Sequence, residues 1–96
     1  LELAGHANAM AARLAAGLTE LGAVLNYDVD GNMVFATLPR AAHARAKAKG
    51  AIYHLWCSDT ALIGDPKTPQ MARFVASWST TPKHVDTLLA AFSDAA

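Results

Sequence analysis

The sequence predicts a single α/β domain of the α+β type, in which a small, mostly antiparallel sheet of about four strands carries helices on one face. Three observations lead to this prediction. Apolar residues recur at helical spacing near both ends of the chain, alternate along the sequence in its middle, and are separated by turn-forming segments. With 96 residues the chain is shorter than an average domain, so we expect residues 1–96 to form one unit with the order α-β-β-α-β-β-α.

The first element is expected to be an amphipathic helix of about twenty residues that ends near Gly22. Its many alanines favour helix, and its larger apolar residues are spaced seven, four, four and three positions apart. These residues are Leu3, Met10, Leu14, Leu18 and Leu21.

Two strands joined by a turn should follow. Residues 23–27 carry Val24, Leu25 and Tyr27, residues 33–38 form an apolar run, and the segment between them is typical of a turn through Asp30 and Gly31. Asp28 and Asp30 also resemble the start of a calcium-binding loop, but the position of its required glutamate is occupied by Pro39. Turn formation therefore explains both aspartates.

A second helix is expected over residues 40–49, with Pro39 before it and Gly50 after its end. Alanine dominates this segment, so its apolar periodicity is weak. Its cations are interpreted as a solvent-exposed basic face made of Arg40, Arg45, Lys47 and Lys49.

The last third of the chain should contain a third strand over residues 51–57, a loop over 58–70 and a fourth strand over 71–78. Thr81 then precedes Pro82, an arrangement typical of a helix cap followed by proline in the first turn. The apolar stripe of this last helix consists of Val85, Leu88, Leu89 and Phe92.

Composition narrows the classes of function. Eight basic and eight acidic side chains cancel, so we expect neither a nucleic-acid partner nor a membrane partner, and no apolar run reaches the length of a membrane span. Only 17% of the residues are charged, which suggests that another protein part covers some of the surface. The single Cys57 favours a reducing, cytoplasmic location. Because the chain opens at Leu1 without a methionine, we expect it to be a piece of a longer protein.

His54 and Cys57 are three positions apart, a spacing that could serve a metal site or a cysteine nucleophile with a histidine base. A zinc site would need two further ligands, and the other histidines, His6, His43 and His84, fall on three separate expected helices. We therefore interpret His54 as a strand-end residue and Cys57 as a small buried thiol, and we assign no metal ligand and no catalytic residue.

Arg73 is the strongest candidate for a binding residue. In an extended strand it shares one face with Met71, Val75 and Ser77, while the opposite face consists of Ala72, Phe74, Ala76 and Trp78. If that second face packs on the helices, Arg73 must look outward. An unpaired guanidinium in an apolar strand is costly, so Arg73 either pairs within the domain, is solvated at an edge, or binds the anionic group of a ligand.

The segment Arg73-Phe-Val-Ala-Ser-Trp-Ser-Thr-Thr-Pro-Lys-His-Val-Asp86 resembles the C-terminal signature of the low-specificity threonine aldolases. Two further segments are similar to that family in the same order: His6-Ala-Asn-Ala-Met-Ala-Ala-Arg-Leu14 resembles the helix that leads into its small domain, and Asn32-Met-Val-Phe35 resembles its strand start. The resemblance spans nearly the whole chain, and the loop over residues 59–70 is longer than in short members of the family.

This resemblance implies an enzyme that uses pyridoxal phosphate and has the fold of type I. The chain would be the C-terminal small domain of this enzyme. Its partner would be the N-terminal large domain, which would make most of the contacts with the cofactor. The implied reaction cleaves a β-hydroxy-α-amino acid of the threonine type into glycine and an aldehyde. In that family the arginine that matches Arg73 binds the substrate carboxylate. The resemblance further implies a homodimer or homotetramer, and a fragment that is inactive by itself and binds no pyridoxal phosphate.

Two other functions remain open. Carboxylate-binding arginines also occur at this position in other enzymes of fold type I, so the chain could belong to a β-eliminating lyase or an aminotransferase. A free-standing α/β module that binds a small ligand is the third possibility. Formation of glycine and acetaldehyde from threonine would separate the first function from the others.

Overall fold

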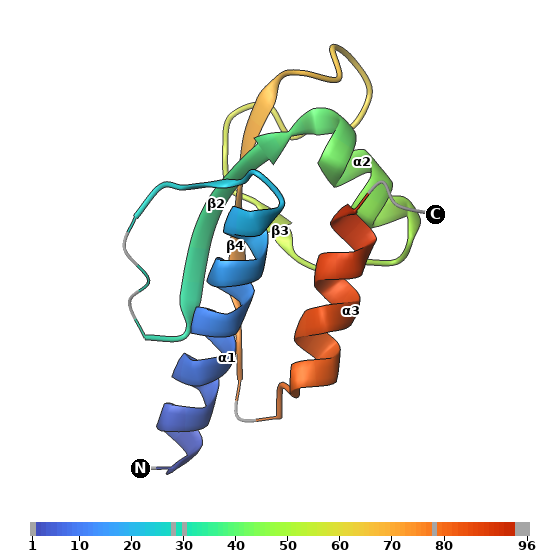
Figure 1. Ribbon diagram of the computed structural model, residues 1–96. Helices are drawn as coiled ribbons and strands as arrows, with labels where there is room; N and C mark the ends of the chain where they lie inside the picture. Colours follow the sequence, from blue (N-terminus) through green and yellow to red (C-terminus); the bar gives the residue numbers. More distant parts are fainter. Residues whose placement is uncertain (1, 28, 30, 78, 94–96) are drawn as a thin grey trace.

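The computed structural model describes residues 2–27, 29, 31–77 and 79–93. Within these residues the elements follow the predicted order, so the predicted α+β fold is confirmed (Figure 1). Their bounds are α1 (Glu2–Glu20), β1 (Val24–Leu25), β2 (Met33–Pro39), α2 (Arg40–Ala48), β3 (His54–Leu55), β4 (Pro69–Val75) and α3 (Pro82–Phe92).

The strands form one antiparallel sheet in the order β1-β2-β4-β3. The predicted hairpin is confirmed, because β1 pairs with β2, with Val24 opposite Thr37. In the centre of the sheet, Arg73 of β4 lies between Phe35 of β2 and His54 of β3. The turn residues Asp28 and Asp30 lie outside the described residues.

The edge strands are shorter than the sequence predicts. Only Val24–Leu25 and His54–Leu55 pair as strands at the two edges, where runs of five and seven residues were expected. Before β3 the side chain of Tyr53 is buried in the core, whereas the neighbouring Ile52 is 92% exposed, so this segment follows the core and leaves the sheet. In the centre, β4 begins at Pro69, two residues earlier than predicted, and ends at Val75, before the predicted end at Trp78, which lies outside the described residues.

The core lies between the helices and one face of the sheet. Figure 1 shows α1 running along the sheet, with α3 beside α1 and α2 beside the end of α3. The rings of Tyr53, Phe74 and Phe92 meet there with centroids 4.8 to 5.9 Å apart. The predicted stripes contribute as expected, except that Leu21 is 42% exposed because α1 ends before it, and the side chain of Leu3 lies outside the described part of the chain. Other buried core residues are Met10, Leu14, Leu18, Val34, Leu38 and Val85.

The last helix begins as the sequence predicts. The Thr81 side chain accepts a hydrogen bond from the backbone N–H of His84, and the His84 ring accepts one from the backbone N–H of Thr81. Pro82 occupies the first turn. This double cap satisfies backbone donors that would otherwise lack partners and fixes where α3 leaves the sheet.

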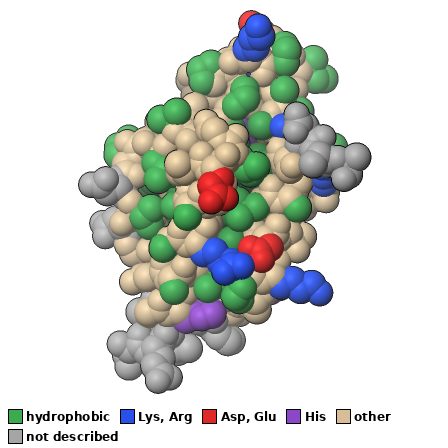
Figure 2. All heavy atoms as spheres, in the orientation of Figure 1, with side chains coloured by type: hydrophobic (Ala, Val, Ile, Leu, Met, Phe, Trp, Pro, Cys, Tyr) green, Lys and Arg blue, Asp and Glu red, His purple; other side chains and the backbone are tan. Residues whose placement is uncertain are grey.

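The surface on the helix side is poor in charge. Figure 2 shows hydrophobic side chains spread across this side, with a few charged side chains between them. Among the charged pairs is Arg13 of α1 with Asp86 of α3, whose two hydrogen bonds measure 3.1 and 2.9 Å. Both side chains are about half exposed, so the pair contributes little stability.

Candidate functional site

The face of the sheet that the helices leave uncovered carries the strongest candidate residue. We call it the outer sheet face, and it consists of Met33, Phe35, Thr37, His54, Met71, Arg73 and Val75. Along β4 the alternation is the predicted one: Ala72 and Phe74 are buried, whereas Val75 is 56% exposed and Arg73 is half-buried. The prediction that Arg73 looks away from the helices is therefore confirmed.

Arg73 lies among mainly aromatic and apolar side chains, with His54 opposite it on β3, and among the described residues we find no charged partner for it. Its guanidinium carbon lies 4.4 Å from the ring centroid of Trp56, on the segment that follows β3. Its Nε atom is buried and lacks a hydrogen-bond partner, and within the described part of the chain we find no ion pair for this side chain. A buried guanidinium donor without an acceptor is costly, so a ligand with a carboxylate or phosphate oxygen would be stabilised there.

The other three arginines all have partners. Arg13 pairs with Asp86, Arg40 pairs with Asp59, and Arg45 donates two hydrogen bonds to the backbone oxygen of Phe92, at 3.1 and 2.8 Å. The hydrogen bond from Arg13 lowers the pKa of Asp86, which keeps that carboxylate charged and engaged. Asp59 and Asp86, two of the carboxylates within the domain, are thus each paired with another arginine.

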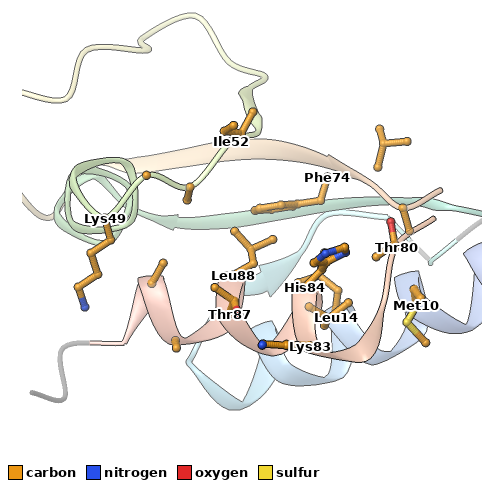
Figure 3. A pocket seen from close by; sticks show the side chains of 17 residues that line it. Met10, Leu14, Lys49, Ile52, Phe74, Thr80, Lys83, His84, Thr87 and Leu88 are labelled. Carbon is orange, nitrogen blue, oxygen red and sulfur yellow. The ribbon is translucent and has the colours of Figure 1, made fainter. Parts of the chain in front are cut away.

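A groove lies on the helix side, between α3 and the end of β4 (Figure 3). This groove has a volume of about 980 Å³ and is open to solvent. Its floor is apolar, with Leu14, Phe74 and Leu88, and Lys49 and Lys83 lie at its rim. This mainly apolar lining has the character of a contact surface.

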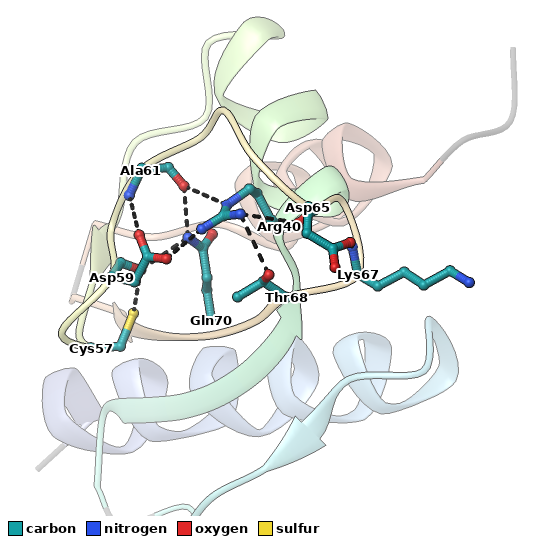
Figure 4. Close-up of polar contacts among 8 residues, drawn as sticks. All are labelled: Arg40, Cys57, Asp59, Ala61, Asp65, Lys67, Thr68 and Gln70. Carbon is teal, nitrogen blue, oxygen red and sulfur yellow. Dashed lines mark hydrogen bonds and ion pairs between the residues drawn. The ribbon is translucent and has the colours of Figure 1, made fainter.

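The loop that follows β3 is organised by one buried cation. Arg40 at the start of α2 has a side chain only 7% exposed, and it binds the loop at four points (Figure 4). It donates hydrogen bonds to the backbone oxygens of Ala61 (2.9 Å) and Asp65 (3.1 Å) and to the Thr68 hydroxyl (3.4 Å), and it pairs with the Asp59 carboxylate.

The prediction of a fully solvated basic face on α2 is therefore wrong for Arg40. Gln70 completes the arrangement, because its amide nitrogen donates to the backbone oxygens of Asp59 and Ala61 at 2.9 and 2.7 Å. A loop rich in proline and glycine needs such internal acceptors and donors when it has no strand to pair with. These contacts tie the loop to the start of α2 and to β4.

A buried polar cluster under α2 was missed by the sequence reasoning. His43 is fully buried; one ring nitrogen lies 2.7 Å from the Tyr53 hydroxyl and the other 2.9 Å from the backbone oxygen of Gln70. Burial lowers the pKa of His43 and raises that of Tyr53. The ring is therefore neutral, donating to Gln70 and accepting from Tyr53.

Lys47 completes this cluster. Its Nζ donates to the backbone oxygen of Tyr53 and lies 3.8 Å from the centroid of the Tyr53 ring, and partial burial lowers its pKa. All the hydrogen-bonding partners we find for His43, Tyr53 and Lys47 are internal, so the cluster holds α2 against the sheet.

His54 and Cys57, the weaker candidates from the sequence, do not form a common site. His54 is exposed on the outer sheet face, and the Cys57 thiol donates a hydrogen bond to the backbone oxygen of Asp59 at 3.2 Å. Cys57 is only partly buried, which differs from the buried thiol expected. In the described ranges, no three or more histidine, cysteine and acidic residues are grouped so that they could hold a metal ion. None of the described helices is long and apolar enough to cross a membrane.

Among the solved structures that match this chain are two enzymes with the same fold. The structure superposes on threonine aldolase from Leishmania major with a TM-score of 0.73 and 24% sequence identity over 91% of the chain. It also superposes on serine palmitoyltransferase from Sphingomonas wittichii with a TM-score of 0.68 and 17% identity over 92% of the chain. No protein-family model matches the sequence, and neither does any curated protein.

At these identities the comparisons establish the fold. The chain covers 23% of each of the two enzymes, so what it matches in them is a part of a longer polypeptide. The resemblance inferred from the sequence motifs is confirmed at this level, because one of the matched structures is a threonine aldolase.

Proposed function

We propose that this chain is the C-terminal small domain of a pyridoxal-phosphate enzyme that cleaves β-hydroxy-α-amino acids of the threonine type into glycine and an aldehyde. In this proposal Arg73 binds the carboxylate of the amino-acid substrate. The observation that supports it best is the buried Nε of Arg73 without a partner, on an uncovered apolar face, while the three other arginines are all paired.

The residues present fit a substrate-binding role better than a cofactor-binding role. An orphaned guanidinium donor suits a carboxylate, and its apolar surroundings would strengthen that charged hydrogen bond. Two of the four lysines are engaged with backbone oxygens: Lys47 with that of Tyr53 and Lys49 with that of Ser93. We assign no residue of this chain to the cofactor, which the longer polypeptide would hold.

Arg73 would act by orientation. Pyridoxal phosphate, when bound, supplies a conjugated ring that accepts the electrons of a bond broken at the Cα atom, provided that this bond stands perpendicular to the ring. By holding the carboxylate at two points, a guanidinium fixes the rotation about Cα and so selects which bond stands in that position. Arg73 itself neither gives nor takes a proton, since an arginine stays charged.

Replacement of Arg73 tests the proposal in the full-length protein. Arg73→Ala removes the partner of a buried carboxylate, a loss of about 2 to 5 kcal/mol, which corresponds to a decrease of roughly 30-fold to several-thousand-fold in kcat/KM for threonine. Arg73→Lys should recover little of this, because an ammonium group cannot make the planar two-point contact. Absorbance of bound pyridoxal phosphate should be unchanged in both variants.

A suitable control is Lys83→Ala, which removes an exposed cation at the rim of the groove on the helix side. We expect it to leave kcat/KM unchanged. Wild-type kcat/KM for threonine in the Arg73→Ala variant would contradict the assigned role of this residue.

The match to serine palmitoyltransferase supports a second candidate function, because this fold also occurs in an enzyme that is not a threonine aldolase. The chain would then belong to another pyridoxal-phosphate enzyme that acts on a small amino acid, such as a β-eliminating lyase or an aminotransferase. Arg73 would still bind a carboxylate. Product analysis separates the two candidates, because only an aldolase forms equal amounts of glycine and acetaldehyde from threonine.

A further inference from the structure

Trp56 is placed by the sheet directly against Arg73. Its backbone N–H donates to the backbone oxygen of Met71 at 2.7 Å, which continues the β3–β4 pairing one residue beyond Leu55. Alternation along this segment puts Trp56 on the same face as His54, the outer sheet face. Trp56 is thereby the diagonal cross-strand neighbour of Arg73, close enough for a large ring to contact it.

The position of Trp56 is restrained from both sides. Before it, Leu55 lies opposite Ala72 and packs against the core. After it, the chain enters the loop held by Arg40, and the Cys57 thiol is bonded to the backbone oxygen of Asp59. The indole is nevertheless half exposed, so its packing alone does not explain why a large aromatic side chain stands there.

We propose that Trp56 is a positioning residue that holds the Arg73 guanidinium ready for a substrate carboxylate. The attraction between a cation and a ring face restrains the guanidinium without using its N–H groups, which stay available for hydrogen bonds in their own plane. Within the described part of the chain, this ring contact is the one specific interaction we find for the Arg73 side chain. The inference rests on the proposed function of Arg73.

The contact also affects what the substrate encounters. An arginine side chain has several rotatable bonds, and ordering it at the moment of binding costs conformational entropy. A guanidinium that Trp56 already restrains has lost part of this freedom before the substrate arrives. Affinity for the carboxylate group should therefore depend on the ring, whereas affinity for the rest of the amino acid should not.

Binding of glycine and of glycinamide to the full-length, cofactor-loaded protein, measured by calorimetry, tests this inference. Glycine carries the carboxylate and glycinamide lacks it. In Trp56→Leu we expect the Kd for glycine to rise about fivefold to thirtyfold, the range for loss of a partly buried cation–π contact. The Kd for glycinamide should change by less than about twofold. Trp56→Phe, which keeps a weaker ring face, should recover part of the glycine affinity.

The matched control is Tyr27→Leu. Tyr27 is 62% exposed and contacts Phe35 edge-on, with ring centroids 5.4 Å apart, so its removal takes an exposed aromatic ring from the same face without touching Arg73. We expect this variant to bind both ligands as the wild type does. Equal weakening of glycine and glycinamide binding in Trp56→Leu would overturn the inference, because a general structural defect explains that result.

Arg73→Ala distinguishes this inference from the function on which it rests. If Arg73→Ala weakens binding of glycine but not of glycinamide, while Trp56→Leu binds both normally, the carboxylate role of Arg73 stands and the role of Trp56 is wrong. If Arg73→Ala binds glycine with wild-type affinity, the proposed function itself fails. If both variants lose affinity for glycine alone, both proposals are supported.

Discussion

Replacement of the buried Arg40 should free the loop that follows β3. The guanidinium makes three hydrogen bonds to Ala61, Asp65 and Thr68 and one ion pair with Asp59, all within a side chain that is 7% exposed. Breaking a fully buried ion pair costs about 3 to 5 kcal/mol. The Asp59 side chain is 56% exposed and can be rehydrated, and the Ala61 oxygen keeps its bond from Gln70. We therefore expect Arg40→Ala to lower the free energy of unfolding by about 2 to 4 kcal/mol.

Arg40→Ala should also weaken the structure of the loop locally, in addition to lowering the stability of the whole domain. The backbone N–H of Ala41 donates to the Pro66 oxygen at 3.0 Å, and that of Thr68 donates to the Asp65 oxygen at 3.2 Å. Both bonds depend on the loop shape that Arg40 maintains, so hydrogen exchange at these two amides should accelerate more than at the amides of β2. Arg40→Lys should behave like Arg40→Ala, because one ammonium group cannot reach acceptors on several sides.

Denaturant unfolding together with hydrogen exchange measures both effects. Lys67→Ala serves as the control, since Lys67 is an exposed cation in the same loop and its removal should change stability by less than about 0.5 kcal/mol. The reasoning is refuted if Arg40→Ala unfolds at the wild-type denaturant concentration, or if the Ala41 and Thr68 amides keep their protection.

Three further predictions concern stability. Burial lowers the pKa of His43 below its ordinary value of 6.5, so the unfolded chain takes up the proton more readily; denaturant unfolding should show stability falling as pH drops below that value, and a flat profile would contradict this. In Gly17→Ala the new Cβ would lie 2.3 Å from a methyl carbon of Leu89, so thermal unfolding should show a loss of about 1 to 3 kcal/mol that Leu89→Ala reduces. Thr81→Ala removes the cap of α3 and should lower stability by about 1 kcal/mol in the same assay. The control is Thr87→Ala, which removes a threonine within α3 that is not the cap.

The elements that sequence reasoning predicts well are those with local signals. The alternation of buried and exposed residues along β4 follows from the period of a strand, and the start of α3 follows from Thr81 and Pro82. The outward orientation of Arg73 is a consequence of that same alternation. The alternation does not predict that the Arg73 Nε lacks a hydrogen-bond partner, because that depends on where carboxylates such as Asp59 and Asp86 lie in space.

The features that sequence reasoning misses depend on contacts between distant residues. The sequence pattern predicts that Arg40 is a solvent-exposed cation on its helix. In the structure its side chain is buried by a loop that begins about twenty positions later in the chain. His43 reads as one histidine on an alanine-rich helix, yet it is buried because Tyr53 and Gln70 converge on it. The edge strand β3 is short because Tyr53, just before it, enters the core, and no local pattern in the sequence predicts this.

The shortness of those edge strands has a consequence for how the chain can associate with itself. An exposed sheet edge invites further strands, and repeated addition of this kind leads to fibrils. Here the two long strands β2 and β4 lie inside the sheet, and each outer edge offers only a two-residue strand, Val24–Leu25 on one side and His54–Leu55 on the other. Lengthening either edge with β-branched residues should therefore raise the tendency to aggregate well before it adds stability, which makes the edges a poor place to engineer this domain.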